Sequence, residues 1–471
     1  MIILSLPYTQ NGGFVEKLMY QGIDAIEYRL DYSERIDEID FSQFSEHHIL
    51  TLRDYSEGGK TQFSREKKGK IYNNIISSTK SLLDDEIQNQ ILDPIEIPPN
   101  RLILSWHANS AEESLQKIEE IIEKTNHLEC KFLKIAVQID HYDQLSAIEN
   151  ALQKSIHTIL LTATGKLGKI VRLLYNHLGA AGTFIGIAGN ETAEGQLTYH
   201  EMELFHLHQA DRDTLIFGIL GGCQVWQSLG LSHYNDKFRT IGINAMYLPF
   251  AIESTADFDT FMNWFTYHFL SYHIRGITIT SPWKFLISEY LSAPLRIMNC
   301  YLPFRQRQNI APWALNTDKD ALINSLATLN ITRGNRILLY GSGAMAELAL
   351  SVMKDYDSLY IYGRNQDRIQ ELCSLYRCDA IDREFLLKND WDVVINCTTI
   401  GMMGESFRLS AGNISFRAVI DLPYSENDTP LISFCKQQKI PYVSGKMFWE
   451  FQAAKQESVF LEEAGRLEVE V

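Results

Sequence analysis

The 471-residue sequence has only seven cysteines, and they are scattered along the chain. The closest two, Cys373 and Cys378, have no nearby histidine or second cysteine pair that would complete a zinc pattern. Neither a disulfide framework nor a metal site is therefore predicted. No apolar stretch approaches the roughly 18 residues that a membrane helix needs. The apolar start, Ile2–Leu6, is too short for a signal peptide and lacks a basic flank. We expect a cytoplasmic protein.

Positive charge is also scarce. Lysine and arginine number 43 against 59 aspartate and glutamate, which gives a formal net charge of −16. This balance argues against nucleic-acid binding, because neutralising phosphates requires a basic face. Any anionic substrate would need a locally basic site built from a few placed arginines and lysines. Nucleic acid is therefore not an expected partner.

The first two hundred residues alternate short apolar runs with helix-like stretches. The runs are Ile2–Leu6, Ala25–Asp31, Ile49–Arg53, Leu102–His107, Phe132–Val137, Thr158–Thr162 and Thr183–Ile187, with a weak one near Ile91–Ile97 that Pro94 interrupts. This alternation predicts an α/β fold that begins with a (β/α)₈ barrel. The polar stretch His206–Asp213 is predicted to be a linker, and a second α/β region opens at Leu215–Ile219.

Charged residues lie at the carboxyl ends of the predicted barrel strands, where active sites of such barrels form. They are Glu27, Arg29, Arg53, His107, Lys134 and Arg172. Burial of Lys134 in an apolar strand disfavours its ammonium form, and a neutral amine attacks ketones to form an imine. An ion pair of Lys134 with Glu27 or Glu57 is the structural alternative. His107 is suited to move protons near neutral pH.

Six short motifs in this region resemble those of the type I 3-dehydroquinate dehydratases. They are Glu27-Tyr-Arg29-Leu-Asp31, Arg53 with Glu57-Gly-Gly59, Ser105-Trp-His107, Lys134-Ile-Ala-Val137, Gly165 to Arg172, and Glu194-Gly-Gln196. Each motif is weak alone, but their order and spacing together make a specific signal. The resemblance covers about the first 200 residues.

The resemblance implies a Schiff-base mechanism on 3-dehydroquinate. Lys134 would condense with the ketone, His107 would take the α-proton and protonate the departing hydroxyl, and Glu57 would tune His107. Arg172 would bind the substrate carboxylate. The remaining contacts are assigned to Glu27, Arg29, Arg53, Thr192 and Gln196. Ala108, Val171 and Thr192 depart from the family pattern.

A glycine turn follows the predicted strand at 337–340. Its residues are Gly341, Ser342, Gly343, Ala344, Met345 and Ala346, a pattern that brings backbone close to a pyrophosphate at a helix N-terminus. The next strand ends in Arg364-Asn365, with Arg368 nearby. Arginine at this position suits a ribose 2′-phosphate, so NADP(H) is the predicted cofactor.

The region from about Asp213 onward resembles the shikimate dehydrogenases. The motifs are Pro282-Trp-Lys284, Asn299, Asn316-Thr-Asp318, Asn396 to Met402, Asp421-Leu-Pro-Tyr424 and Gln452-Ala-Ala454. The resemblance implies hydride transfer from NADPH to 3-dehydroshikimate, with Lys284 and Asp318 sharing the proton relay. Substrate contacts are assigned to Ser228, Thr280, Asn299, Tyr424 and Gln452. Thr398 and Gly445 are assigned to the cofactor.

Together the two resemblances predict the domain boundaries. The barrel would span 1–208, a substrate-binding lobe 213–320, a Rossmann nucleotide lobe 321–450, and a C-terminal helix 451–471 would return to the substrate lobe. Oligomeric state stays open.

Three alternatives also stay open. Ser228-Leu-Gly230-Leu231 lacks a serine and a proline of the dehydrogenase pattern, and the room left by Gly230 would admit quinate. The dehydrogenase half could also have become a binding module. A Schiff-base aldolase fused to a different NADP oxidoreductase would keep Lys134 and the glycine turn.

Overall fold

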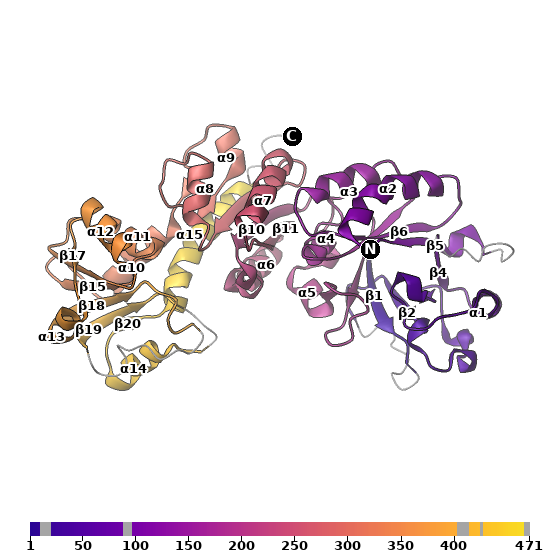
Figure 1. Cartoon of the computed structure of the whole chain (residues 1–471), viewed down its shortest axis with the longest axis horizontal. Helices are drawn as coiled ribbons and strands as arrows, with labels where there is room; N and C mark the ends of the chain where they lie inside the picture. The colour runs from indigo at the N-terminus through magenta and orange to yellow at the C-terminus, as the bar shows by residue number, and fades with distance from the viewer. Residues whose placement is uncertain (10–19, 88–96, 403–413, 424–426, 466–471) are drawn as a thin grey trace. The chain divides into compact units, whose positions relative to one another are not determined.

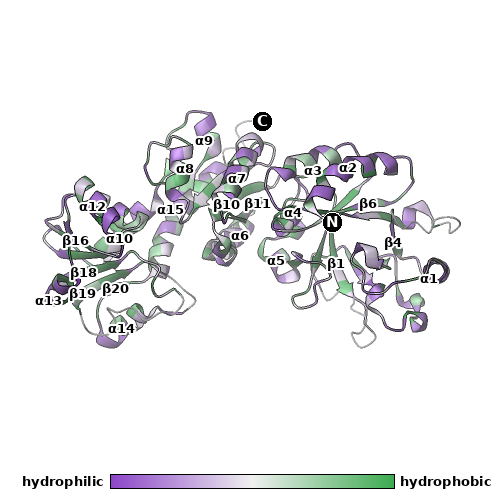
Figure 2. Ribbon diagram, viewed as in Figure 1, coloured by the Kyte–Doolittle hydropathy of each residue, from purple (hydrophilic) through white to green (hydrophobic). Residues whose placement is uncertain are grey.

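The computed structural model describes residues 1–9, 20–87, 97–402, 414–423 and 427–465 (Figure 1). The chain divides into two compact units: Met1–Gly218 with Gly222–Ile274, and Ile219–Gly221 with Arg275–Val471. Strands such as β1 and β19 are largely green in the hydropathy colouring of Figure 2, whereas helix α2 carries much purple on its surface. Across the described ranges, no helix has both the length and the hydropathy to cross a membrane.

The first unit contains a curled parallel sheet with the strand order β7-β6-β5-β4-β3-β2-β1-β8-β9. The strands are β1 (Ile2–Pro7), β2 (Ala25–Arg29), β3 (His48–Thr51), β4 (Leu82–Glu86), β5 (Leu102–His107), β6 (Phe132–Gln138), β7 (Ile159–Thr164), β8 (Thr183–Gly186) and β9 (Leu197–Thr198). A parallel bridge between Leu160 and Gly182 joins β7 to the residue before β8. The sheet thus closes on itself, and the predicted barrel is confirmed.

Helices follow most strands of this barrel. They are α1 (Arg65–Ser78), α2 (Ala111–Thr125), α3 (Gln144–Leu152), α4 (Gly168–Leu173) and α5 (Tyr199–Leu204). Ser64 and Ser110 begin α1 and α2, each accepting a hydrogen bond from a backbone N–H of the first turn. Such caps satisfy N–H groups that have no partner within the helix.

One apolar layer fills the bottom of the barrel and sets the register of its strands. It consists of Ile3, Ala25, Ile49, Leu82, Ile103, Leu160 and Phe184, which are all buried. Side chains of a strand alternate between its two faces, so the residue two positions further on points into the same interior. At that level the strands carry polar groups instead, among them Ser5, Glu27, Asp84 and Ser105. The strand period therefore places a polar layer above the apolar one.

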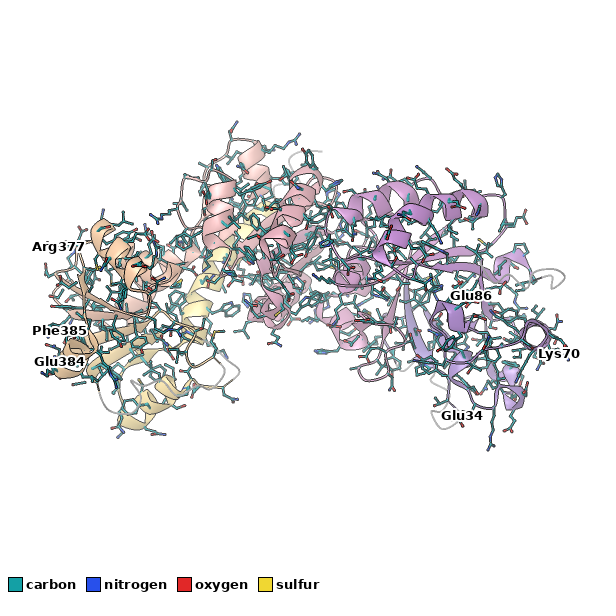
Figure 3. All side chains as sticks on the ribbon, in the orientation of Figure 1. Glu34, Lys70, Glu86, Arg377, Glu384 and Phe385 are labelled. Carbon is teal, nitrogen blue, oxygen red and sulfur yellow. The ribbon has the colours of Figure 1, made fainter. Side chains whose placement is uncertain are left out.

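The fourth barrel strand is not the one that the sequence indicated. The weak run near Ile91–Ile97 falls mostly on 88–96, outside the described residues, and β4 lies between β3 and β5 at Leu82–Glu86. The sequence analysis did not select this segment, which carries three consecutive carboxylates, Asp84, Asp85 and Glu86. All three are buried, and Glu86 is labelled in Figure 3.

Asp85 provides a stability test of this buried strand. Burial raises its pKa to about 7, and the charges of Glu86 and Asp84 raise it further against the attraction of Lys68. The folded-state pKa lies above the unfolded value of about 3.9, so this carboxyl destabilises the fold as the pH rises from about 4 to 7. Above that pH range, the ionised Asp85 lowers the free energy of unfolding by about 4 kcal/mol.

Replacing Asp85 with asparagine is therefore expected to stabilise the protein at about pH 8 by about 2–4 kcal/mol. The gain should shrink towards zero near pH 4, where aspartate is neutral in both states. Urea unfolding at the two pH values measures it. Exposed Asp143 is the matched control, and Asp143→Asn should change stability little. A gain that does not depend on pH would contradict the prediction.

The first unit continues beyond the barrel into α6 (Leu229–Ile241), β11 (Ala245–Ala251) and α7 (Thr255–His268). Buried Tyr142, next to α3, packs against Phe261 and Trp264 of α7 with ring centroids 5.0 and 5.6 Å apart. Tyr272 donates a 2.9 Å hydrogen bond to Glu149 of α3. The barrel and this segment thus share an aromatic core.

A five-stranded sheet has the order β11-β10-β12-β13-β14. Its remaining strands are β10 (Leu215–Gly221), β12 (Ile274–Ile279), β13 (Cys300–Tyr301) and β14 (Ala314–Leu315). Helices α8 (Lys284–Tyr290), α9 (Pro303–Arg307) and α10 (Thr317–Thr328) belong to the same stretch of chain. The turns that lead into α8 and α10 bring Lys284 and Asp318 to their positions.

The second unit also contains a six-stranded parallel sheet with the order β17-β16-β15-β18-β19-β20. Its strands are β15 (Arg336–Tyr340), β16 (Ser358–Tyr362), β17 (Asp379–Ala380), β18 (Asp390–Asn396), β19 (Ser415–Asp421) and β20 (Tyr442–Val443). Its helices are α11 (Ala344–Val352), α12 (Gln366–Leu375), α13 (Arg383–Lys388), α14 (Pro430–Gln438) and α15 (Gly445–Gly465). Numbered along the chain, the order is 3-2-1-4-5-6, that of a Rossmann fold, whose ligand crevice lies where the order reverses. The predicted nucleotide-type sheet is confirmed.

Candidate active sites

A cavity of about 360 Å³ opens at the carboxyl ends of the barrel strands. Its lining includes Glu27, Arg29, Arg53, Glu57, His107, Lys134, Arg172, Thr192 and Gln196. These are the nine residues that the sequence assigned to the first site. The barrel therefore brings together side chains from segments that lie far apart in the sequence.

Lys134 lies at the centre of this polar layer and is 4% exposed. Its Nζ atom is 2.8 Å from Glu27 Oε1 and 2.8 Å from Asp84 Oδ2, and 4.1 Å from the centroid of the Phe184 ring. The isolated amine expected from the apolar strand is therefore not what the fold provides. The ion pair with Glu27 is present, and Asp84 adds a second carboxylate.

Arg53 links the ends of three strands, β3, β4 and β5. Its Nη1 atom donates to Glu86 at 3.2 Å and to Ser105 at 3.1 Å, and Nη2 donates to Asp84 at 3.1 Å. Lys68 of α1 approaches Glu86 from the other side at 2.7 Å. Although burial raises the pKa of Asp84, the Arg53 and Lys134 cations outweigh it and hold that pKa well below its usual range.

Sequence reasoning missed Asp84 and Glu86. The strand period could have identified them, because the last two residues of a barrel strand that point into the interior stand two positions apart. Glu27 with Arg29 on β2 and Ser105 with His107 on β5 follow this rule, and Asp84 with Glu86 follows it on β4.

His107 shares one nitrogen between two partners. Its Nδ1 atom is 2.8 Å from Glu57 Oε2 and 3.0 Å from Arg53 Nη1. Burial, with the positive charges of Arg53 and Lys134, holds the pKa of His107 well below its ordinary value. Burial also raises the pKa of Glu57 to about 8, although Arg53 opposes the rise. The imidazole is therefore neutral at neutral pH, and its tautomer depends on Glu57.

This dependence follows from which group holds the shared hydrogen. When Glu57 is ionised, Nδ1–H donates to the carboxylate and Nε2 keeps a free lone pair. When Glu57 is protonated, it donates to Nδ1 and the ring hydrogen moves to Nε2. Only the first state makes Nε2 of His107 a base.

Arg172 is the arginine of the cavity with the fewest acidic partners. It is 1% exposed, and its Nε atom donates to Ala163 O at 3.2 Å while Nη1 donates to Phe184 O. Burial lowers its pKa to about 9, and Glu27 partly opposes this. In the described part of the chain no carboxylate lies within ion-pair distance of Arg172. Arg29, in contrast, binds Asp31 through two hydrogen bonds of 2.8 and 2.9 Å.

Thr192 and Gln196 belong to the segment between β8 and α5. Gln196 Oε1 accepts a hydrogen bond from the Thr192 backbone N–H at 3.0 Å, and the Thr192 hydroxyl lies 2.7 Å from that of Ser5. Ser5 in turn donates to Glu27. The segment over the cavity is thus linked to the carboxylate that holds Lys134.

The second candidate site centres on Lys284 and Asp318, whose Nζ and Oδ2 atoms are 2.5 Å apart. Both side chains are buried. Next to Asp318, Thr317 donates from its backbone N–H to Asn299 Oδ1 at 2.8 Å. Asn299 is fully buried, so this bond fixes a predicted substrate residue to the helix that carries the predicted catalytic residue Asp318.

Helix α15 supplies a glutamine that the sequence reasoning did not select. Gln456 is buried and donates to Thr317 Oγ1 at 3.0 Å, whereas Gln452 is half-buried one turn earlier. Residues four positions apart share a helix face, which is the signal that could have identified Gln456. The Thr280 backbone N–H donates to Leu220 O at 2.9 Å, and Tyr424 lies outside the described residues.

Gly230 does not leave the space that the sequence suggested. A Cβ atom there would lie 3.1 Å from the Tyr247 ring and 3.3 Å from the Tyr234 ring. The expectation of room for a larger substrate was wrong, because two tyrosines fill that space. Ser228 caps α6, its hydroxyl accepting from the Gly230 backbone N–H at 3.2 Å.

The glycine turn between β15 and α11 has the shape of a nucleotide-binding turn. Gly341 has φ +117°, and a Cβ atom there would come within 2.9 Å of Thr398 Cγ2. A Cβ on Gly343 would meet nothing within 4 Å, so backbone faces open space where α11 begins. Ala346 is buried in the core. The free N–H groups of the first helical turn can bind a pyrophosphate.

Two other assigned cofactor residues are Thr398, which lies next to Gly341, and Gly445. Thr398 donates from its hydroxyl to Asn396 Oδ1 at 2.7 Å, which orders the end of β18. Gly445 begins α15, and a Cβ atom there would lie 2.2 Å from Pro423 O. Only glycine lets these two segments approach so closely.

The two arginines after β16 differ in what they contact. Arg364 is exposed, and among the described residues no carboxylate pairs with it. Arg368 is paired with Glu347 and Glu371, and Asn365 caps α12 by accepting from the Arg368 N–H at 3.0 Å. Of these two arginines, only Arg368 is held by carboxylates among the described residues. Within the described ranges, no cluster of three or more His, Cys, Asp or Glu side chains could hold a metal ion.

Comparison with known proteins finds similar proteins for both halves of the chain. Residues 13–210 match the family model of type I 3-dehydroquinase. The shikimate dehydrogenase (NADP(+)) of Dictyoglomus turgidum is 25% identical over 256 residues, which cover 51% of this chain and 89% of that protein. The enzyme of the same name from Histophilus somni strain 129Pt is 27% identical over 187 residues, covering 37% of this chain and 69% of its own.

Among solved structures, the dehydroquinate dehydratase and shikimate dehydrogenase of S. pombe AroM aligns with 96% of this chain and 93% of its own. The identity is 17% and the TM-score 0.37. Shikimate dehydrogenase from Aquifex aeolicus aligns with 54% of this chain and 98% of its own, at 20% identity and a TM-score of 0.45.

Proposed function

We propose that this chain, which carries a type I 3-dehydroquinase domain and is homologous to shikimate dehydrogenases, is a bifunctional enzyme of the shikimate pathway. It dehydrates 3-dehydroquinate to 3-dehydroshikimate through a lysine Schiff base and then reduces that product to shikimate with NADPH. The observation that carries the proposal is the grouping of Lys134, His107 and Arg172 around one cavity. The same chain holds a buried Lys284–Asp318 pair. We place the enzyme in the cytoplasm, where its seven free cysteines would stay reduced.

The dehydration begins with the ion-paired lysine. Lys134 gives up a proton, the free amine adds to the substrate ketone, and that proton leaves with the carbinolamine oxygen as water. Loss of water leaves an iminium that draws electrons from the neighbouring C–H bond. The carboxylates then stabilise the positive iminium as they had stabilised the ammonium. Burial from bulk water strengthens these contacts.

His107 performs the two proton transfers of the elimination. Its Nε2 atom removes the α-proton, and the resulting enamine expels the β-hydroxyl, which leaves as water after taking that proton from the imidazole. Water then hydrolyses the iminium and releases Lys134. The balance is the net loss of one water molecule. Arg172, which lacks a carboxylate partner among the described residues, would bind the substrate carboxylate.

The link between Glu57 and His107 predicts a pH profile. As Glu57 ionises around its pKa of about 8, more of His107 takes the tautomer with a free Nε2, so dehydratase kcat should rise with pH through this region. Replacing Glu57 with glutamine should lower kcat by about 10²-fold and remove the rise. Steady-state assays across pH measure both effects. If the rise persisted in Glu57→Gln, Glu57 would not be the titrating group.

The reduction uses the second site. NADPH supplies the hydride. Lys284 and Asp318 hold the proton that the developing alkoxide needs, and their 2.5 Å contact lets the aspartate keep the lysine oriented. The open turn at Gly343 would accept the pyrophosphate and Arg364 the 2′-phosphate.

A single assay tests the whole proposal. The intact chain is mixed with 3-dehydroquinate and NADPH, and the loss of NADPH absorbance is followed. Oxidation of NADPH with formation of shikimate requires both steps in sequence, because direct reduction of 3-dehydroquinate without dehydration would give quinate instead. Absence of oxidation with both 3-dehydroquinate and added 3-dehydroshikimate would refute the dehydrogenase. Oxidation with 3-dehydroshikimate alone would refute the dehydratase.

A further inference from the structure

Four side chains of the second unit form a closed ring of ion pairs. The Nε atom of Arg296 lies 3.1 Å from Glu347 Oε1, and its Nη2 atom lies 3.1 Å from Glu371 Oε1. The Nη1 atom of Arg368 lies 2.5 Å from Glu371 Oε2, and its Nη2 atom contacts Glu347 Oε2. Each arginine thus contacts both carboxylates, and the ring has no net charge.

The members of the ring come from segments next to the residues assigned to the substrate and next to those assigned to the cofactor. Arg296 stands three residues before Asn299. Glu347 directly follows the glycine-turn residues on α11, and Arg368 lies on α12, one turn after Arg364. The guanidinium of Arg368 also lies 5.7 Å from the ring centroid of Phe285, the residue after Lys284. Substrate-side and nucleotide-side segments therefore meet at this ring.

Burial differs sharply around the ring. The Glu347 side chain is 1% exposed and that of Arg368 19%, whereas Arg296 and Glu371 are 53% and 47% exposed. A buried carboxylate that lost its main partner would be strongly destabilised, so Glu347–Arg368 is the fixed part. Exposed ion pairs contribute little to stability. Arg296 can therefore be replaced without unfolding the protein.

We propose that Arg296 is a positioning residue of the dehydrogenase site, an inference that rests on the proposed function. By closing the ring, Arg296 holds the segment of Asn299 against α11 and α12, the helices that would bind the cofactor. Hydride transfer needs the two reacting carbons in a near-attack geometry, and a misplacement of about 1 Å can cost about 10²-fold in rate. The ring also occupies Arg368, which leaves Arg364 to bind the 2′-phosphate.

Shikimate oxidation by NADP⁺ in the full-length chain tests this role. The variant Arg296→Gln is expected to lower kcat about tenfold. The deuterium isotope effect with shikimate labelled at the transferred position should rise, because hydride transfer becomes more rate-limiting. The Kd for NADP⁺ should change less than threefold, a shift of about 0.65 kcal/mol. Arg296→Lys should recover part of kcat.

Two further variants complete the test. Glu371→Gln opens the same ring from its other exposed member and should move kcat and the isotope effect in the same direction. Arg417→Gln is the matched control, because Arg417 is an 82% exposed arginine with a single ion pair to Asp392 at 3.5 Å. It should behave like the wild type. NADP⁺ binding also reports that each variant is folded.

The outcomes separate the possible errors. Unchanged kcat and isotope effect in Arg296→Gln would overturn the proposal, and so would an equal loss in Arg417→Gln. A loss confined to NADP⁺ affinity would also overturn it, because the ring would then serve cofactor binding alone. If the wild-type chain itself did not oxidise shikimate, the proposed function would fail instead.

Discussion

Replacing Lys134 with methionine is expected to lower the dehydratase rate by at least about 10⁴-fold. Methionine preserves much of the side-chain volume but cannot form an imine, and the carboxylates of Glu27 and Asp84 lose their shared cation. Reduction of 3-dehydroshikimate by NADPH should be unchanged, since Lys284 and Asp318 are intact. This internal comparison distinguishes lost chemistry from a misfolded chain.

Borohydride trapping gives the same prediction a chemical readout. In the wild-type chain, borohydride with 3-dehydroquinate should reduce the iminium to a stable amine, and peptide mass spectrometry should find the added mass at Lys134. The variant should show no adduct. Exposed Lys131 lies directly before the same strand, so Lys131→Met is the matched control and should keep both activity and adduct. An adduct at another lysine would overturn the assignment.

The second large effect is expected at Lys284. Substitution by methionine should lower the rate of 3-dehydroshikimate reduction by about 10³-fold, within the range for a lost general acid. The alkoxide then has no cation beside it, and Asp318 is left buried without its partner at 2.5 Å. Because the contribution is to proton transfer, kcat should fall far more than the affinity for NADPH.

Exposed Lys319 provides the control for that experiment, since it follows Asp318 on the same helix. Lys319→Met should retain the wild-type rate, and dehydratase activity should be normal in both variants. A Lys284→Met enzyme that kept more than about a tenth of wild-type kcat would show that another group supplies the proton.

Much of the fold could be predicted from local sequence pattern. Apolar runs with strand period located most barrel strands, and the glycine turn at Gly341–Ala346 located the nucleotide-type sheet. The exception was β4, because its carboxylates resemble a solvent-exposed loop until the cations of Arg53 and Lys134 are placed beside them.

The chemical types at the two sites could also be predicted, but their electrostatic state could not. The sequence located Lys134, yet its pairing with Asp84 depends on the barrel bringing β4 and β6 close. Arg368 follows the strand end at which an arginine was expected to bind a phosphate, but its guanidinium is paired with Glu347 and Glu371. At Gly230, two tyrosine rings decide the available space.

By itself, the sequence determined which backbone segments form strands, turns and helices, and which of them carry a lysine, histidine or arginine at an end. These properties depend on neighbours along the chain. Only the tertiary structure decided which charges meet, because Lys134 and Glu27 are 107 positions apart and their attraction depends on distance in space. Closure of the barrel thus brings the Lys134 amine and the Arg53 guanidinium to the same carboxylate, Asp84.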